Sequence, residues 1–156
     1  ISKIKEKVNL PILCKDFFID KFQIPLAKSF GADAILLIVA ALNQNQLEEL
    51  YNKALEYKMS VIIEVHTIEE AKRITSFNNA IIGINNRNLN TLETDLKNTL
   101  KIYKILNNFD GIIISESGIK NQDDVLKISN QTNIKTFLIG ESLLKNLNSN
   151  SIFSLL

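Results

Sequence analysis

The fold is first indicated by Pro11–Phe18 (PILCKDFF), where a short apolar strand runs directly into Lys15. An ammonium group at the carboxyl end of a buried strand is costly unless solvent, a counter-ion or a ligand meets it. Three later apolar runs also end in polar residues, which are Glu64, Asn85 and the pair Ser115 and Glu116. Apolar strands that each end in a polar group are typical of enzymes built on parallel strands.

Six apolar runs of strand length alternate with segments of helical periodicity. The runs begin near Pro11, Asp33, Ser60, Ala80, Gly111 and Lys135. Strands joined through helical crossovers form a parallel sheet, and strands this rich in Ile, Leu and Val are expected to be covered on both faces.

Helix starts are expected at four capping residues. Asn43 with Gln46, and Thr67 with Glu70, have the spacing of a capping box, and Thr94 and Asn121 are further expected N-caps. Pro25 is expected early in a short helix, where its missing N–H costs little.

Two architectures fit this order of elements: an open doubly wound sheet and a (β/α)8 TIM barrel. The open sheet favours a glycine-rich loop after its first strand, and the sequence has none there. We therefore expect an α/β fold, an incomplete (β/α)8 barrel in which residues 1–156 form one partial domain. Its six βα units would be the last six, with strands 3–8 of the closed barrel.

Composition excludes several classes of function. The 156 residues include 18 basic and 17 acidic ones, so no strong field favours nucleic acid or a membrane surface. Cys14 is the single cysteine, which fits a reducing, cytoplasmic setting. No cluster has zinc-ligand spacing, and the lone His66 is expected to be a packing residue, so no metal site is predicted.

Lys15 and Glu64 are the central candidates for catalysis. The lysine can donate a proton or stabilise an oxyanion, and the glutamate can accept a proton. A purely structural ion pair is the alternative. Asn85 can orient a polar substrate or serve only as a turn residue, and Arg87 can bind an anion or remain a solvated loop residue. Phe17 is a further candidate for contact with substrate.

Two loops late in the chain suggest a phosphate site. Glu116-Ser117-Gly118 and Gly140-Glu141-Ser142 would follow the seventh and eighth strands of a completed barrel, where such barrels often bind phosphate. Glycine lets the backbone approach the phosphate, and serine adds a hydroxyl donor. The alternative is that Gly118 and Gly140 only relieve tight turns.

Six blocks along the chain together resemble the indole-3-glycerol-phosphate synthase family of tryptophan biosynthesis. They are PILCKDF (11–17), GADAILL (31–37), IEVH (63–66), GINNRNL (83–89), SESGI (115–119) and LIGES (138–142). The resemblance implies a carboxy-lyase that closes the ring of 1-(2-carboxyphenylamino)-1-deoxyribulose 5-phosphate, with loss of carbon dioxide and water, and needs no cofactor.

The resemblance also implies roles for individual residues. Lys15 matches the general acid, Glu64 the general base or electrostatic stabiliser, and Asn85 an active-site asparagine that orients the substrate. Further matches are substrate-pocket residues (Phe17, Leu36, Arg87, Leu89, Glu116 and Ser117) and phosphate-loop residues (Ser117, Gly118, Gly140, Glu141 and Ser142).

The resemblance is partial at the amino end. Family members have a helical extension and two further βα units before the position of Ile4, including a catalytic glutamate and lysine without counterparts here. We therefore expect a fragment that is inactive by itself. Expected partners are the phosphorylated substrate and either a missing barrel segment or a fused or associated phosphoribosylanthranilate isomerase. Nucleic acid and membrane are not expected partners.

Two other functions remain open from the sequence. One is another sugar-phosphate barrel enzyme, such as an aldolase that forms a Schiff base on Lys15. The other is a non-catalytic phosphate-binding or assembly fragment of a split or decaying gene.

Overall fold

The computed structural model describes residues 1–145 of the chain. The chain divides into two compact units. Unit 1 consists of Ile1–Val65 with Asn79–Ile81, and unit 2, over the described residues, consists of His66–Asn78 with residues 82–145.

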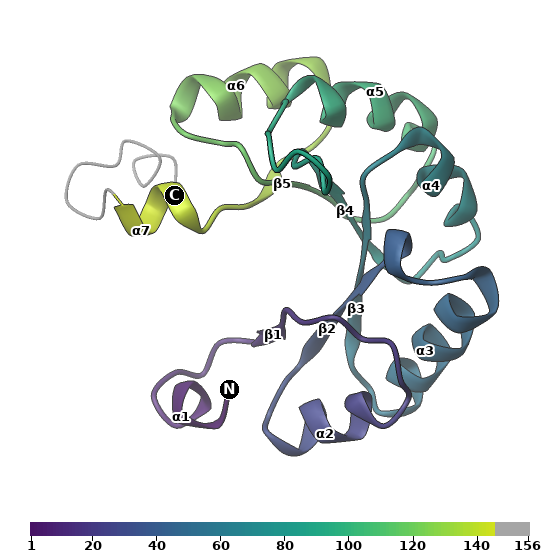
Figure 1. The fold of residues 1–156 in the computed structure, drawn as a ribbon. Helices are drawn as coiled ribbons and strands as arrows, with labels where there is room; N and C mark the ends of the chain where they lie inside the picture. The colour runs from purple at the N-terminus through teal and green to yellow at the C-terminus, as the bar shows by residue number, and fades with distance from the viewer. Residues whose placement is uncertain (146–156) are drawn as a thin grey trace. The chain divides into compact units, whose positions relative to one another are not determined.

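Unit 1 contains three parallel strands. It comprises α1 (Ser2–Lys5), β1 (Leu13–Cys14), α2 (Gln23–Ser29), β2 (Ala34–Ile38), the 3-10 helix η1 (Val39–Ala41), α3 (Gln44–Glu56) and β3 (Ser60–Val65). β2 pairs with β1 and with β3, with Cys14 opposite Ile35 and Ile38 opposite Glu64. Helix α3 packs on β2 and β3 and also contacts α2 (Figure 1).

Helix α3 begins as the sequence predicts. Asn43 Oδ1 accepts a hydrogen bond from the Gln46 backbone N–H at 2.9 Å, and Gln46 Oε1 accepts one from the Asn43 N–H at 3.1 Å. This reciprocal pair is a complete capping box. Its apolar face is buried against the strands through Leu47 and Leu50.

Unit 2 contains the other three strands, again parallel. It comprises α4 (Ile68–Arg73), β4 (Ile81–Asn85, of which Ile81 belongs to unit 1), α5 (Lys97–Leu106), β5 (Ile113–Glu116), α6 (Gln122–Gln131), β6 (Thr136–Leu138) and α7 (Glu141–Lys145). β5 pairs with β4 and β6, and Glu116 lies opposite Asn85 on one side and Leu138 on the other. The strand ends that carry polar residues are therefore level across this sheet.

The helix starts of unit 2 differ in part from the sequence predictions. Asn121 caps α6 by accepting from the Asp124 N–H at 3.0 Å, as expected. Thr67 caps α4, but the Glu70 carboxylate accepts from the His66 N–H instead of completing the box with Thr67. The prediction of Thr94 as an N-cap was wrong. Thr94 lies in an antiparallel bridge with Arg87, three residues before α5 begins at Lys97.

The fold is an incomplete (β/α) barrel, as the sequence predicts. Within the described part of the chain, the parallel strands alternate with helices, and each apolar run that was expected to form a strand does so. No helix in residues 1–145 is long and apolar enough to cross a membrane.

Candidate functional site

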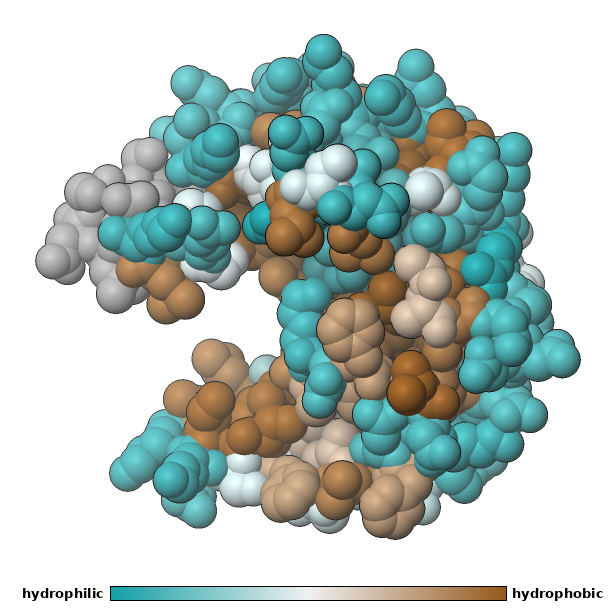
Figure 2. Space-filling view, viewed as in Figure 1, coloured by the Kyte–Doolittle hydropathy of each residue, from teal (hydrophilic) through white to brown (hydrophobic). Residues whose placement is uncertain are grey.

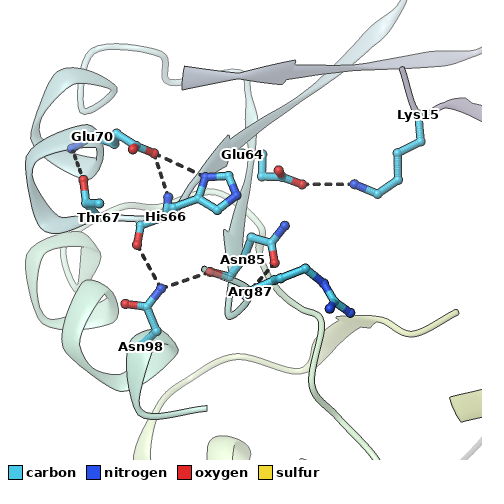
Figure 3. Close-up of polar contacts among 8 residues, drawn as sticks. All are labelled: Lys15, Glu64, His66, Thr67, Glu70, Asn85, Arg87 and Asn98. Carbon is cyan, nitrogen blue, oxygen red and sulfur yellow. Dashed lines mark hydrogen bonds and ion pairs between the residues drawn. The ribbon is translucent and has the colours of Figure 1, made fainter. Parts of the chain in front are cut away.

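Lys15 and Glu64 meet in unit 1 at the carboxyl ends of their strands. Lys15 follows β1 directly, and Glu64 is the penultimate residue of β3. Lys15 Nζ donates to Glu64 Oε2 at 3.0 Å (Figure 3). The carboxylate side chain is only 3% exposed, whereas the lysine side chain is 43% exposed. The proximity expected for these two groups is thus observed.

The unequal exposure of this pair matters for its chemistry. Burying a carboxylate as fully as Glu64 is costly without a cationic or hydrogen-bonding partner, and Lys15 supplies one. The lysine reaches solvent on its other side, so its ammonium group can also meet a ligand. The geometry permits both the structural and the catalytic reading of the pair.

Asn85 ends β4 in unit 2 and is held through its side chain and its backbone. Its Oδ1 accepts from the Arg87 N–H at 2.9 Å, and its backbone carbonyl accepts from Asn98 Nδ2 at 3.0 Å. Asn98 Nδ2 also donates to the His66 carbonyl at 3.0 Å, so this α5 side chain ties two loop starts together (Figure 3). Asn85 is therefore fixed in orientation.

His66 is placed by Glu70 from the first turn of α4. Glu70 Oε2 accepts from the His66 backbone N–H at 2.7 Å and lies 3.5 Å from His66 Nδ1 (Figure 3). Burial alone would raise the pKa of the Glu70 carboxyl, but the bonds from the His66 side chain and backbone, aided by Arg73, hold that pKa below its usual range. Residues 1–145 contain no group of three or more potential metal ligands that could hold an ion.

A pocket of about 470 Å³ lies in unit 2 between the loops after β5 and β6. All five residues predicted to bind phosphate line it. The lining consists of Arg87, Thr94, Ser117, Gly118, Ile119, Lys120, Leu138, Ile139, Gly140, Glu141, Ser142 and Lys145.

The charges of this pocket favour an anion. Its ionisable lining residues are three cations, Arg87, Lys120 and Lys145, and one carboxylate, Glu141. Glu141 lies 2.7 Å from Lys145 Nζ and 3.6 Å from Arg87 Nη2. The hydrogen bond from Lys145 is the main cause that lowers the Glu141 pKa, and Arg87 lowers it further. Because it stays anionic, the Glu141 carboxylate is unsuited to contact phosphate directly, and any such contact would come from its backbone.

The two glycines that line the pocket are under different structural constraints. Gly118 has φ +77°, and a Cβ there would lie 2.8 Å from Thr94 Cβ. Its packing and its backbone conformation both exclude a side chain. A Cβ at Gly140 would meet no atom within 4 Å, so neither a turn nor a neighbour requires glycine at this position. Gly140 is among the residues that line the pocket, and the lack of a side chain leaves its backbone open to a ligand.

The other predicted substrate residues lie in varied surroundings. Leu36 is buried within β2, and Glu116 is buried at the end of β5. Phe17 and Leu89 are exposed by 62% and 47%. Leu36 thus offers no exposed surface in this state, while Phe17 and Leu89 are accessible.

Sequence reasoning missed several residues that build the site. Asn86, Asn98 and Thr99 fix the end of β4, and Thr94, Lys120 and Lys145 line the pocket. A signal existed for Asn86, since it extends the polar run that follows an apolar strand. The contributions of Asn98 and Thr99 depend on how α5 packs, which the sequence pattern does not specify.

Comparison with known proteins decides the family. The family model described as indole-3-glycerol phosphate synthase matches residues 1–155. The chain belongs to this family. A synthase of that name from Bacillus cereus (strain B4264) is 46% identical over 153 residues, and one from Bacillus anthracis (strain CDC 684 / NRRL 3495) is 44% identical. Each match covers 98% of this chain and 60% of the relative, so the chain spans little more than half of these synthases.

A solved structure supports the fold independently. The crystal structure of KGPDC from Streptococcus mutans superimposes with a TM-score of 0.71, covering 95% of this chain and 71% of that one. At 14% sequence identity, this likeness concerns the fold alone.

Replacing each of the two pocket glycines by alanine is expected to change a different property of the protein. Gly118→Ala should lower the free energy of unfolding by about 1–3 kcal/mol, because it forces a left-handed residue against Thr94. Gly140→Ala should change it by less than about 0.5 kcal/mol, yet weaken binding of inorganic phosphate. Urea unfolding and phosphate titration of both variants measure the two effects. Equal stabilities for the two variants would contradict this assignment.

The Glu70 contact is expected to make stability depend on pH. Because the folded-state pKa of Glu70 is lowered, its contribution is present above the unfolded value of about 4.3 and is lost as the pH falls through the folded value. The melting temperature of the parent should exceed that of Glu70→Gln at pH 7, and the difference should close in acid. Glu69→Gln, in the same helical turn, is the control. A difference independent of pH would refute the contact.

Proposed function

We propose that this chain carries the catalytic and phosphate-binding residues of an indole-3-glycerol-phosphate synthase acting in a reducing cytoplasm. The observation that carries the proposal is the 3.0 Å pair of Lys15 and Glu64, the two residues to which the family resemblance assigns proton transfer. The substrate would be 1-(2-carboxyphenylamino)-1-deoxyribulose 5-phosphate and the product indole-3-glycerol phosphate. Family membership and the cationic pocket of unit 2 support it.

Lys15 and Glu64 would divide the proton transfers. The aromatic ring carbon attacks the sugar carbonyl, and the new alkoxide takes a proton from the Lys15 ammonium. Carbon dioxide then leaves and restores the electron pair to the ring system. In the dehydration that follows, the hydroxyl group takes a proton from solvent and leaves as water, while the lone pair of the ring nitrogen forms a C=N bond. Glu64 would stabilise the positive charge that develops on this nitrogen, or accept the proton lost from the neighbouring sugar carbon as the indole forms. The half-exposed lysine beside a buried carboxylate suits this division of roles.

The residues of unit 2 would hold the substrate. We assign the phosphate to the pocket between the loops after β5 and β6, with Ser117, Gly118, Gly140 and Ser142 as its closest neighbours. Arg87 would add positive charge, and the fixed amide of Asn85 would orient a polar group of the substrate. Leu89 is a further substrate-contact assignment in unit 2, and Phe17 is the corresponding assignment in unit 1. Leu36 and Glu116 are also assigned to the substrate pocket, but both are buried in this structure, so contact would require their side chains to become accessible when the substrate binds.

The surface of unit 1 suggests a structural partner. Large apolar side chains gather over α1, β1 and α2, and appear brown and tan in Figure 2. Among them, Leu10 is 68% and Phe22 71% exposed. Because the matched synthases extend beyond the region aligned with this chain, we propose that a further segment of the family fold packs on this surface. Burying one such side chain stabilises by about 1.5–3 kcal/mol.

A chimera provides the test of the catalytic assignment. In it, this chain replaces the 153 matched residues of the Bacillus cereus synthase, and the relative supplies the remainder. We expect the chimera to form the fluorescent indole product, and Lys15→Ala and Glu64→Ala each to reduce kcat by more than about a hundredfold. Lys21→Ala, which breaks the exposed Lys21–Glu49 pair of unit 1, is the matched control and should turn over normally.

Two outcomes would contradict the proposal. Unchanged rates in Lys15→Ala and Glu64→Ala would make their ion pair structural. A Lys15 adduct trapped by borohydride in the presence of a keto-sugar phosphate would indicate Schiff-base chemistry instead.

A further inference from the structure

A buried polar network in unit 2 is bonded to the loop after β5, which lines the candidate phosphate pocket. Its centre is Asn86, the residue after β4, whose side chain is almost fully buried. Asn86 Nδ2 donates to the backbone carbonyls of Glu116 at 3.0 Å and Ser117 at 3.1 Å, and lies 3.1 Å from Ser115 Oγ. The side-chain amide of Asn86 therefore contacts three consecutive residues, Ser115–Ser117, which lead from the end of β5 into the loop that lines the pocket.

The other side of this amide is fixed by α5. Asn86 Oδ1 accepts from the Thr99 backbone N–H at 3.0 Å and from Thr99 Oγ1 at 2.8 Å. Thr99 Oγ1 also lies 2.8 Å from Ser115 Oγ, and neither residue is exposed to solvent. Because Asn86 Nδ2 faces acceptors and Asn86 Oδ1 faces donors, the orientation of the amide is determined.

The loop that Asn86 holds has an unfavourable backbone conformation. Ser117 has φ +66° and is followed by Gly118 at +77°. A left-handed conformation is costly for a serine and persists only when surrounding contacts impose it. The bond from Asn86 to the Ser117 carbonyl is such a contact, and it sets the direction of the peptide that joins Ser117 to Gly118.

We infer that Asn86, held by Thr99, is a positioning residue that keeps Ser117 left-handed and so directs the Ser117–Gly118 backbone at a phosphate group. This inference rests on the proposed function, because that function supplies the phosphate. Asn86 does not line the pocket, so it acts only through the loop.

The test is a titration of the 156-residue chain with inorganic phosphate, in which the amide resonance of Gly118 reports binding. We expect Asn86→Ala to weaken binding about tenfold, since it frees the Ser117 carbonyl, and Thr99→Val about threefold. Thr99→Ser keeps the hydroxyl and should restore parental affinity. Thr132→Val is the matched control, because Thr132 is also a buried threonine of unit 2 with two hydroxyl hydrogen bonds, to Ile128 and Ile134, away from the pocket.

The control separates positioning from general loosening of the fold. Thr132→Val should lower the melting temperature about as much as Thr99→Val while leaving phosphate affinity unchanged. Equal weakening by both, or parental affinity in Asn86→Ala and Thr99→Val, would overturn the inference and leave the proposed function intact. A parent chain that binds no phosphate would contradict both.

Discussion

Polar side chains buried at the carboxyl ends of parallel strands have to find partners inside the protein, and this requirement shapes both units. Burying an unpaired amide or carboxylate costs several kcal/mol, which is a large part of a domain's net stability. Glu64 meets this requirement with Lys15, and Asn86 with Thr99 and Ser115. Each pairing also fixes a functional group in place.

The same requirement explains how the chain's own contacts set the geometry of the candidate site. In unit 2, Asn85, Glu116 and Leu138 are level across the sheet, so the loops that follow them start from one edge. Hydrogen bonds from Asn86 then set the loop after β5, and the cations that surround Glu141 give the pocket its positive charge. An anion entering this pocket would meet groups already oriented, which lowers the cost of binding.

The sequence was informative where chemistry follows local pattern. The apolar runs predicted the strands, and the polar residues that end them predicted Lys15 next to Glu64 and both pocket loops. It was uninformative where a partner comes from a distant element. Thr94 has the residue type of an N-cap but lies beside Gly118 instead. Thr99 is reached by Asn86 only because the start of α5 lies beside the ends of β4 and β5. Such contacts depend on tertiary packing, which the spacing of residues within a short stretch of sequence does not reveal.

The most direct measurement is a crystal structure of the Bacillus cereus chimera with indole-3-glycerol phosphate bound. We predict the phosphate within about 2.7–3.2 Å of backbone N–H groups in the loops that contain Gly118 and Gly140, with Ser117 still left-handed. A well-ordered product whose phosphate lies outside this pocket would contradict this prediction.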